Sequence, residues 1–187
     1  MMRLSLPLLV LAALFSPIVA PPALAGCSDV PGPEVYWRRC VLDRQDLADI
    51  DFSGATLRDS SFKRADLSRS LLKDVDGRRA KFVSAIMQEV VLDQANLVRA
   101  DFTKVDLKDA SLRGADLTDA RLFRADLSGA DLTDARLANT DLLQAVLDGA
   151  TWIDGETICA KGSIGRCLRE RKSSPSPEVG ADTEPPA

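Results

Sequence analysis

The chain contains no histidine among its 187 residues and a single tyrosine. The commonest general base and metal ligand is therefore missing. No glycine-rich phosphate loop follows an expected strand, and the Gly-Gly-x-Gly-x-Asp pattern of calcium-binding β-helices does not occur. These absences disfavour an enzyme, and they predict no catalytic residue, no metal site and no cofactor.

Proline is also missing from most of the chain. All ten prolines lie outside residues 34–174, as a continuous ladder of backbone hydrogen bonds would require. Within that stretch every fifth residue from Leu42 to Trp152 is large and apolar, with Gly77 as the exception. The 23 central positions hold sixteen Leu, four Phe, one Met, one Trp and this glycine. The residue two places earlier is Ala at fourteen of them, and the residue just before is Asp or Asn at eleven.

A period of five fits neither the 3.6 residues of a helical turn nor the alternation of a flat strand. A short repeat sustained over many units indicates a solenoid, in which each unit buries its apolar residue against its neighbours. The tandem Ala-(Asp/Asn)-Leu-x-x units resemble the pentapeptide repeat family, over about 115 of the 187 residues. The resemblance implies an all-β fold, namely a right-handed quadrilateral parallel β-helix with four repeats per coil and about six coils.

The stretches outside the repeat predict the domain organisation. Residues 1–25 carry one charge, an apolar run too short to span a bilayer and a small-x-small cleavage site, which predicts a secretory signal peptide. Because the ends of a solenoid need covering, residues 26–39 are interpreted as an N-terminal cap without the repeat. Residues 40–154 form the predicted β-helix, and residues 155–169 a C-terminal cap. Residues 170–187, rich in Pro, Ser and charge, are predicted to be a disordered tail.

Four cysteines flank the repeat in two pairs. An exported chain with an even number of cysteines predicts disulfides. The expected pairs are Cys27 with Cys40 and Cys159 with Cys167. The residues before Cys27 also resemble a bacterial lipoprotein box, and lipidation would leave Cys40 unpaired; the disulfide is the favoured alternative. Zinc binding by all four is disfavoured, since the pairs flank opposite ends of a rod. The chain is therefore predicted to be exported, periplasmic or secreted, or else anchored as a lipoprotein.

Four repeats per coil would stack residues that are 20 apart. Phe62, Phe82 and Phe102 should then form a column inside the coil. Glycines two places after a central residue mark corners where unusual backbone angles are needed; they are Gly54, Gly114, Gly129 and Gly149. Gly77 interrupts another column, and residues 73–79 are interpreted as a small outward bulge in preference to a poorly filled coil.

Sorting the outward residues by side gives two neighbouring faces of opposite charge. The face that contains Leu42 and its stacked equivalents carries seven Lys or Arg against three Asp, and the next face carries two against eight Asp or Glu. Aligned like charges point to an anionic partner, although exposed charges also keep a rod soluble without any partner. The candidate interaction residues on the basic face are Arg44, Arg64, Lys81, Lys104, Arg121 and Arg124.

A second candidate surface is apolar. Outward apolar side chains near the end of the repeat predict a contact patch, for a partner or for a homodimer through the C-terminal coils as in cytoplasmic relatives. Its residues are Phe123, Leu143, Val146 and Ile153.

These features favour a non-enzymatic exported structural or interaction module that presents flat charged faces to a protein or an anionic envelope partner. The alternative is a DNA mimic that protects a topoisomerase, as some pentapeptide repeat proteins do. The basic face and the export signal count against that alternative. Nucleic acid is disfavoured as a partner, and a membrane is expected only if Cys27 is lipidated.

Overall fold

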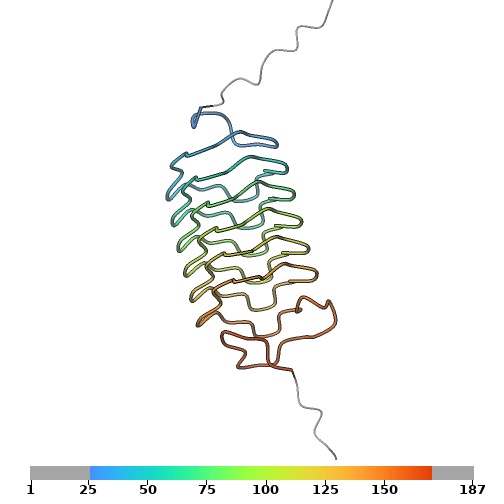
Figure 1. Ribbon diagram of the computed structural model, residues 1–187. Helices are drawn as coiled ribbons and strands as arrows, with labels where there is room; N and C mark the ends of the chain where they lie inside the picture. The colour runs from blue at the N-terminus through green and yellow to red at the C-terminus, as the bar shows by residue number, and fades with distance from the viewer. Residues whose placement is uncertain (1–25, 170–187) are drawn as a thin grey trace, which may run out of the picture.

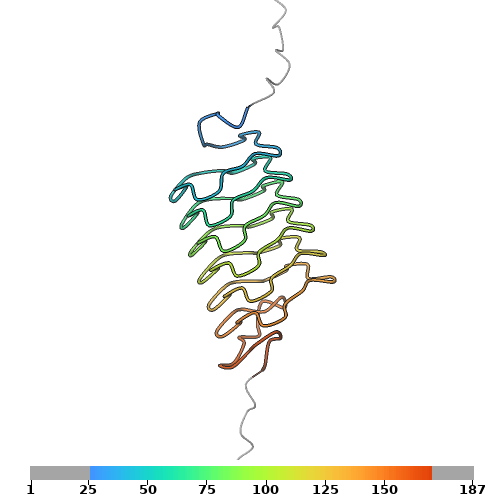
Figure 2. The same ribbon diagram turned by 90° about the vertical axis from the view of Figure 1, so that its left-hand side faces the viewer.

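The computed structural model describes residues 26–169, which form a single stack of coils (Figure 1). In this range no residue is helical, and each strand is reduced to a single bridged residue. Parallel bridges join residues 20 apart, from Tyr36 with Thr56 to Asp131 with Thr151. Four repeats therefore make one coil, and the fold is a quadrilateral β-helix with less regular sheet than an all-β class suggests. The coils stay in register along the stack (Figure 2).

Four columns of bridged residues run along the four sides of the coil. The first is Tyr36, Thr56, Asp76, Asn96, Asp116, Arg136; the second is Val41, Ser61, Lys81, Asp101, Arg121, Asp141. The third is Asp46, Asp66, Ile86, Asp106, Asp126, Val146; the fourth is Asp51, Leu71, Val91, Ser111, Asp131, Thr151. We name the sides the Tyr36, Val41, Asp46 and Asp51 faces. Each face comprises its bridged column and the two turn residues that follow each central residue.

Each corner is a four-residue turn that begins at a central residue. At the corner after Phe52, the N–H of Ala55 donates to the Phe52 carbonyl oxygen at 2.9 Å. The third residue of the turn has a positive φ, as a type II turn requires. The predicted glycine corners are confirmed, with φ of 69° at Gly54, for example. Within the described residues, the same conformation also occurs at 20 non-glycine positions, among them Arg64 with φ of 58°.

The aspartate before the central residue stabilises the turn. The Oδ1 atom of Asp66 accepts hydrogen bonds from the N–H of Ser68 at 2.9 Å and from its hydroxyl at 2.6 Å. Asp131 binds Thr133 in the same way, at 2.9 and 2.5 Å. Asp and Asn suit this position because their short side chains reach the backbone two residues ahead. The Asp/Asn preference of the repeat therefore has a local structural cause.

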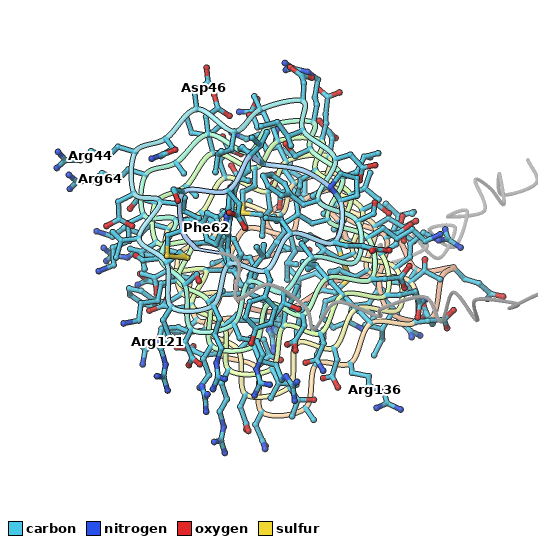
Figure 3. The ribbon with its side chains drawn as sticks, turned by 90° about the horizontal axis from the view of Figure 1, so that it is seen from above. Arg44, Asp46, Phe62, Arg64, Arg121 and Arg136 are labelled. Carbon is cyan, nitrogen blue, oxygen red and sulfur yellow. A yellow bond between two sulfur atoms is a disulfide. The ribbon has the colours of Figure 1, made fainter. Side chains whose placement is uncertain are left out.

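The interior is filled by the central residues and by the small residues two places before them. Central residues from Leu47 to Leu132, other than Gly77, are at most 2% exposed. The predicted phenylalanine column is confirmed: Phe82 stacks between Phe62 and Phe102, with ring centroids 5.2 and 4.9 Å apart. Figure 3, a view from above the stack, shows Phe62 inside the coil.

The bulge predicted at Gly77 is wrong. Asp76 bridges Thr56 and Asn96 in the regular pattern, and the N–H of Gly77 donates to the Asn96 carbonyl oxygen at 2.9 Å. A Cβ atom on Gly77 would lie only 2.9 Å from Cδ2 of Leu97. The side chain of Leu97, one coil further on, therefore leans into the space that a residue at position 77 would fill, and the backbone keeps its course.

The coil begins before residue 40, so the predicted N-terminal boundary is wrong. Trp37 takes a central position, is 1% exposed and packs against Phe52 with ring centroids 5.6 Å apart. Glu34 already has the positive φ of a corner, 57°. The preceding central position is held by Gly32, which has no side chain to show the period. Pro33 fits the second position of the turn, because its ring fixes φ in the range that this position requires.

The C-terminal segment covers only part of the last coil. Antiparallel bridges join Thr151 to Ile158 and Val146 to Ile164, on the Asp51 and Asp46 faces. The columns of the Tyr36 and Val41 faces end at Arg136 and Asp141 without a further bridge. The central residues beneath them, Leu137 and Leu142, are accordingly only partly buried, as is Trp152.

Both expected disulfides are present. Cys27 and Cys40 are joined by an S–S bond of 2.05 Å with Cα atoms 5.3 Å apart, and Cys159 and Cys167 by one of 2.03 Å with Cα atoms 4.9 Å apart. Their sulfurs are therefore not available to a zinc ion. The predicted signal peptide at 1–25 and the predicted tail at 170–187 lie outside the described residues.

Candidate anion-binding interface

The Tyr36 and Val41 faces adjoin and together form what we call the basic half of the rod. The Val41 face has the seven cations and three carboxylates expected from the sequence. The Tyr36 face adds seven arginines against four aspartates, a second basic face that sequence reasoning missed. Its arginines are Arg38, Arg39, Arg58, Arg78, Arg79, Arg99 and Arg136, and its aspartates Asp59, Asp76, Asp116 and Asp119. The basic half therefore carries fourteen cations against seven carboxylates.

The Asp46 and Asp51 faces form the acidic half. The Asp46 face has the predicted eight carboxylates against two cations, and the Asp51 face has six against two. The residues of the Asp51 face are Asp51, Asp74, Asp93, Asp131, Asp134 and Asp154 against Lys73 and Arg113. The charge of the rod is therefore divided lengthwise. Counting the charges on all four sides of the coil would have identified the basic Tyr36 face and the acidic Asp51 face from the sequence.

The positive charge of the basic half is concentrated toward the N-terminal coils. Residues 36–104 contribute eleven of its cations and four of its carboxylates, while residues 116–144 contribute three of each. The electrostatic attraction for an anion is therefore strongest over the first half of the rod.

The six predicted interaction residues all lie on the Val41 face, in two columns. Arg44 and Arg64 project side by side from one corner, and Arg121 projects from the same side of the rod nearer the other corner (Figure 3). Lys81 and Arg121 belong to the bridged column. Lys104 and Arg124 continue the corner column of Arg44. Arg124 differs from the others because its Nε donates to Gln144 at 2.6 Å and its guanidinium lies 5.0 Å from the centroid of the Phe123 ring.

Some arginines of the basic half are tightly paired. Arg79 donates to both oxygens of Asp59, at 2.6 and 3.0 Å, and this hydrogen bonding lowers the pKa of Asp59. Arg78 holds Asp76 similarly, with both contacts at 2.8 Å. Burial alone would raise the pKa of Asp76, but the hydrogen bonds from Arg78 outweigh it and the pKa falls. These arginines are already neutralised.

Other cations of the basic half have no such partner. Within residues 26–169, eight of the fourteen have no carboxylate oxygen within 4 Å; they are Arg38, Arg39, Arg44, Lys63, Arg64, Lys81, Lys104 and Arg124. Asp43, which lies among them, is occupied by the Ser61 hydroxyl at 2.6 Å and the Lys63 N–H at 2.9 Å. The free cations therefore remain available to an external anion.

Shallow hollows lie on the described part of the basic half, and three of them each extend over at least three successive coils. One of about 440 Å³ is lined by Asp43, Arg44, Lys63, Arg64, Val83 and Ser84. A second of about 310 Å³ lies at the corner between the two basic faces, and a third of about 220 Å³ adjoins it on the Tyr36 face. Because they span coils, the hollows follow the long axis of the rod.

The predicted apolar patch is not one surface. Phe123 and Leu143 stack on the Val41 face, where Leu143 is 63% exposed and Phe123 is half-buried. Val146 lies on the Asp46 face and is bridged by Ile164, and Ile153 lies on the Asp51 face. Residues close in sequence near the end of the repeat are on different sides of a four-sided coil, so only the Phe123–Leu143 pair remains as a contact.

Two aspartates of the bridged columns, Asp51 and Asp116, are not suited to act as general acids. A hydrogen bond from the Thr118 side chain lowers the pKa of Asp116, and one from the Ser53 side chain lowers the pKa of Asp51. Such carboxylates stay ionised at neutral pH and cannot donate a proton as a general acid. In the part of the chain that the structure describes, no three carboxylates or cysteines are grouped as a metal site, and no helix is long and apolar enough to cross a bilayer.

Two family models match the chain. A model described as pentapeptide repeat region matches residues 45–122, and one described as pentapeptide repeats (8 copies) matches residues 125–151. No sequence among the curated proteins matches significantly.

Several solved structures resemble the coil. The pentapeptide repeat protein Rfr23 from the cyanobacterium Cyanothece 51142 is 25% identical, with a TM-score of 0.47 over 64% of this chain and 88% of that one. A pentapeptide repeat protein from the thylakoid lumen of Arabidopsis thaliana is 25% identical, with a TM-score of 0.35 over 66% and 83%. QnrB1, a plasmid-mediated fluoroquinolone resistance protein, is 20% identical, with a TM-score of 0.42 over 62% and 69%.

Proposed function

The chain belongs to the pentapeptide repeat family, and we propose that it is a non-catalytic exported module that binds a linear anionic polymer along its basic half. The observation that carries the proposal is the lengthwise division of charge between two pairs of faces. Solubility alone needs net charge, which mixed faces would supply equally well.

Aligning like charges opposes folding. Residues in one column stand about 4.8 Å apart from coil to coil, and two unit charges 4 Å apart repel by about 1 kcal/mol even in water. Arg44 and Arg64 occupy such neighbouring positions without a carboxylate between them. A polyanion bound along the column would offset this repulsion, because it attracts the cations of successive coils.

A linear polymer suits this surface better than a planar one. The hollows extend along the rod over several coils, so a chain laid lengthwise would meet cations from successive coils. A lipid surface would touch only one flat face or one edge of a four-sided rod, and the free cations lie on two faces. The exposed apolar residues described on the basic half are scattered, with Tyr36 and Val41 at its N-terminal end and Leu143, beside the half-buried Phe123, toward the other, and they offer little to insert among lipid tails.

The two disulfides support export. Disulfides persist in oxidising compartments and are rare in the cytosol. The sulfur of Cys27 is bonded to that of Cys40, which favours a soluble exported form over a lipoprotein. The acidic half gives some support to the second candidate function, a DNA mimic. That role belongs in the cytoplasm, where both disulfides would be reduced, so we rank it lower.

Binding of two polymers to the oxidised chain from residue 26 tests the proposal, with sodium polyphosphate and polygalacturonate as probes. Binding should weaken steeply with salt, because exposed charges are screened beyond about 8 Å at physiological ionic strength. Reversing Arg44, Arg64 and Lys104 to Glu should abolish it. The backbone accepts Glu at these corners, since Glu34 and Glu89 already have the same positive φ, 57° and 55°.

A matched control reverses three corner residues of the acidic half, Asp49→Lys, Glu89→Lys and Asp109→Lys. This variant should bind at least as tightly as the wild type. Failure of the wild type to bind either polymer would overturn the proposal, as would equal binding by the two reversed variants. Binding to anionic lipid vesicles but to neither polymer would replace the polymer by a membrane surface.

A further inference from the structure

The corner between the two basic faces carries a hollow with an unusual set of charges. About 310 Å³ in volume, it is lined by Arg79, Lys81, Arg99, Ala100, Asp101, Asp119 and Arg121. Four cations thus face two carboxylates. The lining comes from three successive coils and from both basic faces, so the cations surround the hollow from several directions.

The four cations differ in how they are held. Arg79 is committed to Asp59 through two short hydrogen bonds, at 2.6 and 3.0 Å. Arg99 reaches Asp119 only at 3.5 Å, and Arg121 approaches Asp101 only to 3.8 Å. Charge-assisted hydrogen bonds are normally about 2.7–2.9 Å long. Lys81 has no carboxylate within 4 Å among the described residues. Three cations, those of Lys81, Arg99 and Arg121, therefore keep most of their donors free.

The two carboxylates are partly occupied elsewhere. Oδ1 of Asp101 accepts from the N–H of Thr103 at 3.0 Å and from its hydroxyl at 2.6 Å, as the turn requires. Oδ1 of Asp119 accepts from the Asn139 amide at 3.3 Å. Only the Oδ2 atoms approach Arg121 and Arg99. The carboxylates hold these side chains near the hollow without saturating them.

We propose that this corner hollow is a phosphate site, formed by Lys81, Arg99 and Arg121. The inference rests on the proposed function, because it identifies the anionic groups of the polymer as phosphates. A single carboxylate from a ligand would offer these cations nothing that Asp101 and Asp119 do not already offer. The terminal phosphate of a polymer, like free phosphate, carries up to two charges on at least three acceptor oxygens, which match the planar fork of arginine. It can engage three donors from different coils at once and displace the loose internal pairs.

The spacing of the residues fits this assignment. Lys81 and Arg121 belong to one bridged column and stand two coils apart, about 10 Å along the rod, with Asp101 between them. Arg99 lies at the corner one coil from each. Long, exposed side chains can close this triangle around one tetrahedral group. The adjoining hollow, lined by Arg58, Arg78, Arg79, Val98, Arg99 and Asp119, extends the positive surface for the next group of a phosphate polymer.

Isothermal titration of the oxidised chain with inorganic phosphate and with polyphosphate tests the site. The hollow variant combines Lys81→Gln, Arg99→Gln and Arg121→Gln, and should lose at least about tenfold in affinity for both probes, since a hydrogen bond to a charged group contributes about 1.5–3 kcal/mol. A matched control combines Arg44→Gln, Arg64→Gln and Lys104→Gln on the same face. It removes the same charge, and because these residues lie outside the corner hollow, its affinity for inorganic phosphate should fall by less than about threefold.

The six substitutions in the two variants should leave the protein folded. All six substituted side chains lie outside the core, and Gln94 and Gln144 show that glutamine accepts the corner conformation, with φ of 58° and 60°. The phosphate site is overturned, with the proposed function left intact, if the two variants lose equal affinity for inorganic phosphate. The same holds if the wild type binds polygalacturonate as tightly as polyphosphate. Failure of both polymers to bind would overturn both.

The source of the phosphate is distinguished by further arms of the same experiment. Vesicles containing phosphatidic acid present the group on a lipid, and inorganic phosphate presents it free. The polymer is supported as the source if polyphosphate, counted per phosphate, binds at least about tenfold more tightly than inorganic phosphate or the vesicles, and if the hollow variant loses this difference. A higher affinity for the vesicles would overturn the polymer as the source.

Discussion

The space at Gly77 permits a sharp test of how this core is packed. The repeat pattern alone says that Gly77→Leu should stabilise the coil, since it restores a missing leucine. The structure predicts the opposite, because a Cβ atom on residue 77 would lie 2.9 Å from Cδ2 of Leu97. Overpacking of this kind costs about 1–3 kcal/mol, and the gain from replacing glycine, about 0.4–1 kcal/mol, does not offset it. We expect Gly77→Leu to destabilise the protein.

The double variant is the decisive measurement. Leu97→Ala alone should lower the free energy of unfolding by about 2–5 kcal/mol, because it leaves a cavity at its own position and in the space beside Gly77. Adding Gly77→Leu should then refill that space. The double variant should therefore be more stable than the sum of the single effects by about 1–3 kcal/mol, the range seen for residues in contact. Urea unfolding of the oxidised proteins, followed by circular dichroism, gives each free energy.

A matched control uses Leu117, the next central residue of the same column. It stands two coils from Gly77, about 10 Å away, and Leu97 lies between them. Gly77→Leu and Leu117→Ala should therefore be additive within about 0.5 kcal/mol. The packing argument is refuted if Gly77→Leu stabilises the wild type, or if its effect is the same with and without Leu97.

Three other predictions follow from features of the core, the cap and the titrating groups. Phe82→Leu removes two stacked ring pairs and should lower the free energy of unfolding by about 1–3 kcal/mol; an unchanged urea midpoint would show that stacking contributes nothing. Replacing Cys159 and Cys167 by Ser should cost about 2–3 kcal/mol on the chain-entropy model, seen as a lower thermal midpoint, and an equal midpoint would contradict a stabilising role for this disulfide. Hydrogen bonds from Thr157 and Glu156 lower the pKa of Asp154 to about 2, so the stabilisation is complete above the unfolded pKa of about 3.9 and is lost as the pH falls toward 2. Hydrogen-exchange protection of the cap should decrease across that window, and Asp154→Asn should remove the pH dependence; an identical profile in the variant would refute this role.

The parts of the fold that depend on period were predictable from the sequence. A large residue every fifth position predicts a solenoid, and the resemblance to the pentapeptide repeat family implies four repeats per coil, which stacks Phe62 on Phe82. The disulfide pairs followed from the export signal and the even cysteine number. These predictions needed no knowledge of any side-chain conformation.

Other features depended on what neighbouring coils do. The regular course of the chain at Gly77 results from the side chain of Leu97, a full coil further along the chain, which no local pattern reveals. The first coil was missed because its central position at Gly32 has no side chain. The candidate interface was only partly predicted from the sequence. The Val41 face was identified, but the arginines of the Tyr36 face were not counted. Free cations could be told from paired ones only by interatomic distances, such as that between Arg79 and Asp59.

The stacking of four repeats into each coil also has a mechanical consequence. One coil adds about 4.8 Å to the length of the rod, yet its chain would reach roughly 66–72 Å when pulled straight. Each coil contacts only its neighbours, so a force applied along the axis should unwind the rod from an end, one coil at a time, in steps of roughly 60–67 Å. The disulfides Cys27–Cys40 and Cys159–Cys167 each close a short loop at one end, and neither joins one end to the other. They shorten the terminal steps and leave the middle coils free to unwind, so a short rod holds a reserve of chain many times its own length.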